Sequence, residues 1–327
     1  MLMLYNNDID IAPILARKVA VIGYGSQGRA QALNLRDSGV DVTVGLRPKS
    51  PGREQAAADG VAVADVVEAV AAADVVAMLI PDEAQPAVYR SIEPSLREGA
   101  TLVFAHGFNI HYGRIEPRAD LDVVMAAPFG IGEKVRSLYE AGGGTAGMVA
   151  VDADASGHAL SIALGFAKAL GLGHGGVIET TFKEETETDL FAEQAVLCGG
   201  LTHLITAAYE TLVGAGYAPE IAYFSCLHEV KLMADVIHTE GIARMRESIS
   251  STAAFGDATR GPRVINEQSR REMAAMLDEI RDGRFAEEQA REMAAGGPVL
   301  AEYRREAAGH SIEKVGRPLR EAMKNED

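Results

Sequence analysis

An acidic run between residues 184 and 193 offers the kind of ligands that a metal ion takes. Asp189 and Glu193 stand four residues apart, so they share one face of a predicted helix. The other acidic residues of the run are Glu184, Glu185 and Glu187. Carboxylate oxygens suit a hard cation such as Mg²⁺, which usually keeps several waters. A solvated acidic helix explains the same pattern, although the apolar residues that follow make full exposure of the segment unfavourable.

Residues 23–28 fit the pattern G-x-G-x-x-G. The six residues are Gly23, Tyr24, Gly25, Ser26, Gln27 and Gly28. The first glycine permits a tight turn, the second lets the backbone approach a pyrophosphate, and the third brings helix and strand together. An apolar strand pattern precedes the loop and a helical pattern follows it, and this context makes the motif informative. We therefore predict a dinucleotide site at the start of this helix and favour it over a structural glycine-rich turn.

The loop after the second predicted strand indicates which nucleotide binds. NAD sites usually carry Asp or Glu there, to bind the ribose 2′-hydroxyl. This chain instead has Arg47, Lys49 and Ser50, with Arg53 just beyond. Cations and a hydroxyl suit a 2′-phosphate, because guanidinium and ammonium groups pair with its charge. The loop predicts NADPH as the cofactor, and a solvated basic loop is the alternative.

Strand and helix patterns alternate through the first half of the chain. Strands are predicted over residues 18–23, 40–45, 74–80, 101–105, 122–126 and 147–151, with helices over 26–38 and 54–59. Buried apolar strands separated by helices indicate a parallel sheet covered on both faces. The predicted fold class is therefore α/β, with a Rossmann-like, doubly wound parallel sheet.

The pattern changes near residue 181. No strand pattern follows residue 183, and helices are predicted over 185–214, 218–239 and 267–282. We expect two domains: a nucleotide-binding domain over residues 1–181 and an all-helical domain over residues 182–327.

Composition excludes some classes of partner. With 31 Lys and Arg against 47 Asp and Glu, the formal net charge is −16, which disfavours a general nucleic-acid binder. Asp8 and Asp10 interrupt any basic-then-apolar leader, and apolar runs are shorter than the ~20 residues that span a bilayer. Cys198 and Cys226 lie in apolar sequence, which favours buried free thiols. We expect a cytoplasmic protein with no membrane partner.

Several long strings of this sequence resemble ketol-acid reductoisomerases. They are residues 20–28, the segments Pro81-Asp82-Glu83-Ala84-Gln85 and His106-Gly107-Phe108-Asn109-Ile110-His111, and residues 179–191 and 193–200. The resemblance covers about residues 4–320. It implies a Rossmann domain joined to a single knotted helical domain, as in the short form of the family. It further implies an enzyme that isomerises a 2-hydroxy-2-alkyl-3-keto acid by alkyl migration and then reduces the product with NADPH, with two Mg²⁺ ions holding the substrate oxygens.

The resemblance also implies roles for particular residues. His106 corresponds to the histidine beside the nicotinamide and the substrate, and Ser250 to the serine that contacts the substrate carboxylate. Asp189, Glu193 and Glu229 correspond to metal ligands, of which Asp189 and Glu229 also count as catalytic. Asp82, Gln85 and Gly132 belong to the cofactor-binding set. Two subunits build each active site in the short form, so the resemblance implies a homodimer or an assembly of dimers through the helical domain.

Two positions depart from the family pattern. The family carries a lysine where this chain has Phe129, and a ring can donate neither a proton nor a charge-assisted hydrogen bond. The family also carries a second glutamate four residues before Glu229, where this chain has Ser225. A serine hydroxyl is a weak, neutral ligand, so one of the two metal sites should weaken or vanish.

These departures affect alkyl migration more than hydride transfer, because migration depends on carbonyl polarisation by paired metals. We predict an NADPH-dependent reductase of a 2-keto or imino acid, with one or two Mg²⁺ ions and weakened or lost alkyl migration. Two alternatives remain open at this point: a full ketol-acid reductoisomerase of valine and isoleucine synthesis, and a non-catalytic dinucleotide-binding protein.

Replacing both Arg47 and Ser50 with Asp should shift the cofactor preference toward NADH, because the new carboxylates repel a 2′-phosphate and accept from a 2′-hydroxyl. The ratio of kcat/KM for NADPH and NADH measures the shift. An unchanged ratio would refute the assignment of this loop.

Overall fold

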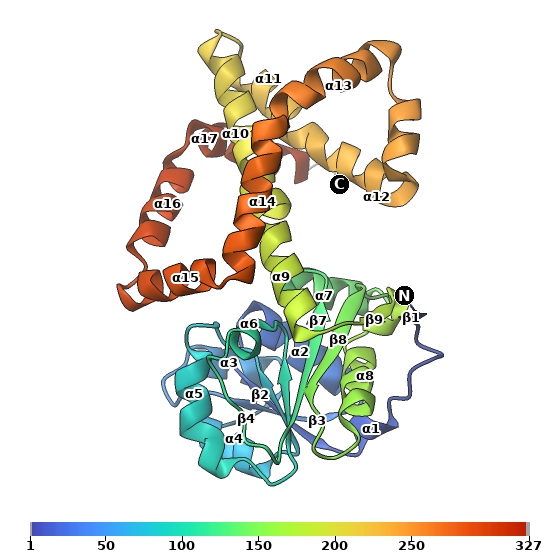
Figure 1. Ribbon diagram of the computed structural model, residues 1–327, viewed down its shortest axis with the longest axis vertical. Helices are drawn as coiled ribbons and strands as arrows, with labels where there is room; N and C mark the ends of the chain where they lie inside the picture. Colours follow the sequence, from blue (N-terminus) through green and yellow to red (C-terminus); the bar gives the residue numbers. More distant parts are fainter. Residues whose placement is uncertain (1, 325–327) are drawn as a thin grey trace. The chain divides into compact units, whose positions relative to one another are not determined.

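The computed structural model describes residues 2–324, which fall into two units divided between Thr188 and Asp189. The N-terminal unit contains one sheet of nine strands (Figure 1). The strands are β1 (Met3–Leu4), β2 (Lys18–Ile22), β3 (Asp41–Gly45), β4 (Ala62–Ala64), β5 (Val75–Met78), β6 (Thr101–Phe104), β7 (Asp122–Pro128), β8 (Gly147–Ala153) and β9 (Val177–Glu179). Their order across the sheet is β1-β9-β8-β7-β6-β5-β2-β3-β4.

The sheet is mostly parallel, as the sequence predicts, with two reversed strands near one edge. Strands β4, β3, β2, β5, β6 and β7 are mutually parallel neighbours. Strand β8 pairs antiparallel with β7, and β9 pairs parallel with β8. The predicted doubly wound parallel sheet is confirmed, with β8 and β9 as local exceptions in direction. An apolar run reports the burial of a strand but not its direction, so the sequence pattern left this reversal undetected.

Helices cover both faces of the sheet because alternate side chains of each strand point to opposite faces. Val19 and Val21 of β2 join the core under α1 (Ala12–Leu15), α2 (Ser26–Asp37) and α8 (Ala159–Ala169). Ala20 and Ile22 join the other core, under α4 (Val66–Ala72) and α5 (Gln85–Ile92). Figure 1 shows α4 and α5 on one side of the sheet and α1 and α8 on the other. The remaining helices of this unit are α3 (Gly52–Ala58), η1 (Glu93–Ser95), α6 (Phe108–His111), α7 (Gly132–Glu140) and η2 (Leu172–His174).

The parallel arrangement brings the segments that follow β2, β3, β5, β6 and β7 to one edge of the sheet. The glycine loop follows β2, the basic loop follows β3, and the segment that contains Asp82 follows β5. His106 follows β6, and Phe129 follows β7. Ligands of open α/β sheets bind at this carboxyl edge.

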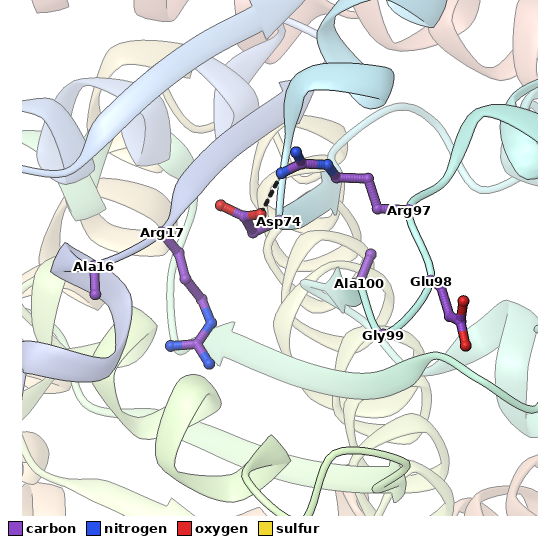
Figure 2. A pocket seen from close by; sticks show the side chains of 7 residues that line it. All are labelled: Ala16, Arg17, Asp74, Arg97, Glu98, Gly99 and Ala100. Carbon is purple, nitrogen blue, oxygen red and sulfur yellow. Dashed lines mark hydrogen bonds and ion pairs between the residues drawn. The ribbon is translucent and has the colours of Figure 1, made fainter.

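The opposite edge carries a shallow hollow of about 540 Å³ (Figure 2). Its lining comes from the segments just before β2, β5 and β6, and Arg97 pairs there with Asp74 at 2.6 Å. Figure 2 shows the Arg17 side chain turned away from this pair. The hollow lies at the amino ends of the strands and contains none of the predicted site residues.

The C-terminal unit consists entirely of helices within the part of it that the structure describes. It begins inside α9 (Phe182–Ala192) and continues through the π-helical turn η3 (Glu193–Leu197), α10 (Gly199–Gly214), α11 (Pro219–Tyr223), the π-helical turn η4 (Phe224–His228), α12 (Glu229–Ser248), α13 (Ser251–Val264), α14 (Glu267–Arg281), α15 (Arg284–Ala294), α16 (Pro298–Gly309) and α17 (Ser311–Lys324). A small core joins α10, α11 and α17 around the buried Tyr209, Tyr223 and Ile312.

Some elements differ from the expectations. The sequence predictions omit the short strands β1, β4 and β9 and the helices α13 and α15–α17, although α17 carries Ile312, Val315 and Leu319 at helical spacing. Both cysteines are free as expected, but Cys198 is exposed and Cys226 is only half-buried, so the expectation of buried thiols was wrong for Cys198 and holds only in part for Cys226. Among the described residues, one helical run (182–214) is long and apolar enough by composition to cross a membrane. One such run is weak evidence, because core helices of non-membrane domains share its composition.

Candidate functional site

The glycine loop is shaped by contacts that only glycine permits. Gly23 has a φ of +104°, and a Cβ there would lie 2.4 Å from the carbonyl oxygen of Leu79. A Cβ on Gly28 would lie 2.5 Å from the carbonyl oxygen of Gly23. A Cβ on Gly25, at the start of α2, would meet no atom within 4 Å. The backbone N–H groups at the start of α2 are therefore open to an anionic ligand.

Helix α7 packs its first residue against this loop. A Cβ on Gly132 would lie 2.2 Å from the carbonyl oxygen of Ser26, and Gln27 Nε2 donates to the carbonyl oxygen of Gly130 at 2.9 Å. A hollow of about 600 Å³ opens beside the loop, lined in part by Gly25, Ser26 and Gly132. The structure thus brings Gly132 together with the predicted pyrophosphate site, although the two are more than a hundred residues apart.

The Tyr24 side chain binds a carboxylate at the end of α3. Its hydroxyl donates to Asp59 Oδ2 at 2.9 Å, and Arg29 forms a bidentate ion pair with the same carboxylate. The hydrogen bond and charge of Arg29 hold the pKa of Asp59 well below its usual range. Burial, followed by the hydrogen bond to Asp59, raises the pKa of Tyr24 above its usual range. Both effects keep Asp59 ionised and Tyr24 neutral, so this cluster braces the loop.

The basic loop after β3 contains one arginine with a structural role. Arg53 Nη1 donates to the carbonyl oxygen of Leu46 at 2.8 Å and pairs with Asp65 at 2.8 Å. The expectation that Arg53 adds to a phosphate-binding group is therefore not supported, because this guanidinium braces the loop. Arg47 and Lys49 are exposed, and Ser50 Oγ accepts from the Gly52 backbone N–H at 3.3 Å.

His106 contacts a buried carboxylate that the sequence pattern did not single out. His106 Nδ1 lies 2.9 Å from Glu185 Oε1, and the backbone N–H of Gly107 donates to Glu185 Oε2 at 2.8 Å. The Glu185 side chain is 2% exposed and lies in the first turn of α9, where the helix dipole favours a negative charge. A carboxylate can only accept here, so this hydrogen bond favours the His106 tautomer that carries a proton on Nδ1.

The sequence did not distinguish Glu185 from its neighbours Glu184 and Glu187, because nothing in an acidic segment of a helix indicates which carboxylate is buried. The four-residue spacing from Glu185 to Asp189 was the available sign, since it places both on one face of a helix. A Cβ on Gly107 would lie 2.4 Å from Thr186 Oγ1, so this glycine lets the segment after β6 approach α9 closely.

Helix α9 continues unbroken from Glu185 to Asp189, the first residue after the N-terminal unit. Mg²⁺ prefers oxygen donors, so the Asp189 carboxylate suits the ion, whereas an imidazole does not. The donor chemistry of Asp189 therefore fits the expected metal.

The remaining predicted residues of the second half lie on separate elements of the C-terminal unit. Glu193 begins the π-helical turn η3, Glu229 directly follows the turn η4, and both side chains are exposed. Local π-helical turns are frequent at functional sites. Ser250 precedes α13, and its hydroxyl accepts from the backbone N–H of Ala253 at 3.2 Å, which caps that helix.

Comparison with known proteins identifies the family. A family model described as the NADPH-binding domain of acetohydroxy acid isomeroreductase matches residues 13–176, and one described as the C-terminal domain of ketol-acid reductoisomerase matches residues 182–325. The chain belongs to the ketol-acid reductoisomerase family. It is accordingly an NAD(P)-dependent oxidoreductase, and this membership sets aside the alternative of a non-catalytic nucleotide-binding protein.

Solved structures agree with this assignment. An NADH-preferring ketol-acid reductoisomerase from an uncultured archean is 42% identical, with a TM-score of 0.95 over 98% of this chain and 99% of that chain. A semialdehyde dehydrogenase NAD-binding protein from Cupriavidus necator (19% identity, TM-score 0.63, 81% and 99% of the two chains) shares the fold alone. The same holds for pyrroline carboxylate reductase from Plasmodium falciparum (14%, 0.52, 82% and 98%).

The two departures from the family pattern lie in different units. Phe129 directly follows β7, and its backbone N–H donates to the carbonyl oxygen of Ala146 at 2.9 Å. Its side chain is 51% exposed, so the ring is not part of the sheet core. Ser225 lies in the turn η4 and is exposed.

Replacing Glu185 with Gln should lower kcat for NADPH-dependent turnover by about 10²-fold or more and leave NADPH affinity nearly unchanged. The Gly107 N–H requires the glutamine oxygen, so the glutamine NH₂ faces His106 Nδ1 and moves the ring proton to Nε2. Steady-state rates and NADPH titrations measure the two effects.

Glu184→Gln is the matched control for this prediction, because Glu184 is exposed on the same helix and its side chain accepts from Thr180 Oγ1 at 2.8 Å, away from His106. Equal loss of turnover in both variants would contradict the role given to Glu185.

Proposed function

We propose that this chain is an NADPH-dependent reductase of a 2-keto or imino acid whose alkyl-migration activity is weakened or lost. The proposal is carried by one combination of features. The glycine loop and the His106–Glu185 pair lie at the same carboxyl edge of the sheet, while Phe129 stands where the family has its lysine. Hydride transfer requires a placed cofactor and a proton source, and both are available without an ammonium at position 129.

The residues of the chain divide the reductive step between them. Residues 23–28 and Gly132 receive the pyrophosphate, Arg47, Lys49 and Ser50 receive the 2′-phosphate, and Asp82 and Gln85 border the nicotinamide end. Bound NADPH supplies the hydride. When Nε2 of His106 also takes up a proton, the ring can deliver that proton to the reduced oxygen, and the Glu185 carboxylate bonded to Nδ1 stabilises the positive charge of the doubly protonated ring.

Asp189, Glu193 and Glu229 would hold one or two Mg²⁺ ions. Such an ion supplies Lewis-acid polarisation of a substrate oxygen. Ser250 positions the carboxylate of the substrate. Because Ser225 replaces a carboxylate, three acidic ligands only partly balance the four positive charges of two Mg²⁺ ions. The second Mg²⁺ should therefore bind more weakly, and the alkyl migration that depends on a metal pair should slow.

NADPH is proposed over NADH because Arg47, Lys49 and Ser50 replace the acidic residue that recognises a 2′-hydroxyl. The NADPH-binding description of the matching family domain supports the proposal. The 42% identical structure is of an NADH-preferring enzyme, so the preference differs within the family and requires measurement.

A full ketol-acid reductoisomerase of branched-chain amino acid synthesis is the second candidate. The high similarity to a ketol-acid reductoisomerase over nearly the whole chain favours it. In this case the site carries out both steps despite Phe129 and Ser225.

Rates with acetolactate and with plain 2-keto acids, each with Mg²⁺ and NADPH, separate the two candidates. We expect plain 2-keto acids to be reduced and acetolactate to be converted slowly. The double variant Phe129→Lys/Ser225→Glu should raise acetolactate turnover by about 10²-fold, because it restores an ammonium and a fourth carboxylate. Brisk conversion of acetolactate by the unaltered chain would establish the second candidate instead.

We further propose that two copies of the chain associate through their helical units into a homodimer or an assembly of dimers. The C-terminal unit has a small core, and many of its large apolar side chains are exposed. They include Leu201, Leu204, Ile221, Leu232, Ile242 and Phe255. Apolar surface on this scale is typical of an interface between subunits. No nucleic-acid or membrane partner is proposed, and a cytoplasmic location suits the small-molecule substrate.

Leu204→Glu should convert the assembly to smaller species, because a carboxylate placed in an apolar interface loses its hydration without a partner. Sedimentation velocity measures the change. Leu138→Glu is the control, since Leu138 is similarly exposed but lies in the N-terminal unit. A chain that sediments as a monomer before any substitution would contradict the proposal.

A further inference from the structure

Asn109 ties together two segments at the carboxyl edge of the sheet. It lies in α6, three residues after His106, and is 1% exposed. Its side-chain Nδ2 donates to the backbone carbonyl oxygen of Asp82 at 3.0 Å and to Gln85 Oε1 at 2.9 Å. One amide thereby joins the segment after β6 to the segment after β5. Asp82 is half-buried, and this burial raises the pKa of its carboxyl.

The backbone dictates the direction of this hydrogen-bond chain. Gln85 Nε2 donates to the carbonyl oxygens of Met78 and Ile80, at 3.3 and 3.0 Å. A carbonyl oxygen can only accept, so Gln85 must turn its NH₂ toward β5 and its oxygen toward Asn109. Asn109 must therefore present its own NH₂. An Asp of the same shape presents only acceptors at this place, and a Leu presents neither donor nor acceptor.

Asn109 keeps this orientation although it leaves its own oxygen unsatisfied. Asn109 Oδ1 is buried and has no hydrogen-bond partner among the described residues. Turning the amide over would point that oxygen at two other acceptors, Gln85 Oε1 and the Asp82 carbonyl. The hydrogen bonds that Asn109 Nδ2 donates therefore stabilise this orientation more than the unpartnered Oδ1 destabilises it. Buried unsatisfied groups are rare in proteins and call for a functional explanation.

We propose that Asn109 is a positioning residue for the nicotinamide cofactor. It acts through Gln85, whose orientation it sets, and through the 81–84 segment, which it holds against α6. The role rests on the proposed function in one respect, namely that Asp82 and Gln85 border the bound cofactor. Asn109 itself is too deeply buried to touch the cofactor, and no role in proton transfer is assigned to it.

The test replaces Asn109 with Asp in the full chain. The two side chains have the same shape, but the carboxylate faces Gln85 Oε1 and the Asp82 carbonyl as a third acceptor. We expect NADPH binding to weaken by about tenfold or more and the fluorescence emission of bound NADPH to change. Titration with NADPH in the absence of substrate measures both quantities, and kcat and KM for NADPH are compared afterwards.

Asn34→Asp is the matched control. Asn34 is fully buried in the same unit, and its Nδ2 donates to the carbonyl oxygens of Val135 and Leu170, neither of which belongs to the segment of Asp82 and Gln85. The substitution also turns an acceptor toward two carbonyl oxygens, although Arg136 Nη1, which donates to Asn34 Oδ1 at 2.9 Å, partly offsets the new charge, so it should lower the melting temperature modestly. It should leave the affinity for NADPH and its emission unchanged, because these carbonyls belong to the packing of α2 on α7 and α8.

A second variant keeps the test valid if the Asn109→Asp protein does not fold. Asn109→Ser introduces no charge but is too short to reach Gln85, so it should also weaken NADPH binding. In a Gln85→Leu background, either change at Asn109 should have a smaller effect than in the unaltered chain, because the group it acts through is gone.

The outcomes separate this inference from the proposed function. A folded Asn109→Asp or Asn109→Ser variant that binds NADPH with unchanged affinity and emission would overturn the positioning role. So would an equal loss of affinity in Asn34→Asp. If the unaltered chain binds NADPH but reduces no keto acid, the proposed substrate class fails while the test of Asn109 stands.

Discussion

The Glu185 carboxylate is almost wholly removed from water, and its two oxygens are occupied by His106 Nδ1 and the Gly107 backbone N–H. A buried charge is stable only when it is paired and hydrogen-bonded, so these partners cannot be separated without a large loss of free energy. The first turn of α9 adds the favourable end of a helix dipole. The segment after β6 is thereby held against α9, and the imidazole has one defined tautomer.

The same principle governs the neighbouring polar groups at this edge of the sheet. The carbonyl oxygens at the end of β5 determine the orientation of Gln85, and Gln85 determines that of Asn109. A side-chain substitution cannot remove a backbone carbonyl oxygen. The carbonyl oxygens of Met78 and Ile80 therefore determine the direction of every hydrogen bond in the series from Gln85 to Asn109. These hydrogen bonds order the edge at which we propose that the nicotinamide binds, and preorganisation of this kind lowers the free-energy cost of binding.

The glycine loop follows from a different constraint, which is close packing of backbone on backbone. Gly23 and Gly28 lie where any Cβ would overlap a carbonyl oxygen. Gly132, at the start of α7, likewise lies where a Cβ would overlap the carbonyl oxygen of Ser26. These glycines leave the start of α2 accessible to a phosphate. The family chemistry therefore rests on two kinds of support: glycines that admit the cofactor and a buried carboxylate that orients the histidine. Phe129 disturbs neither, which is why a reductive role is compatible with its presence.

The sequence by itself determined the parallel core of the sheet, the glycine loop, the helical second half and the family, because local periodicity and long matching strings are legible without contacts. It did not determine the reversal of β8 and β9, since burial of a strand carries no direction. Nor did it distinguish Glu185 from Glu184, assign Arg53 to Asp65, or indicate that Asn109 and Gln85 bond each other. Each of these depends on which groups from distant parts of the chain meet in a space without water, and only the tertiary structure decides that.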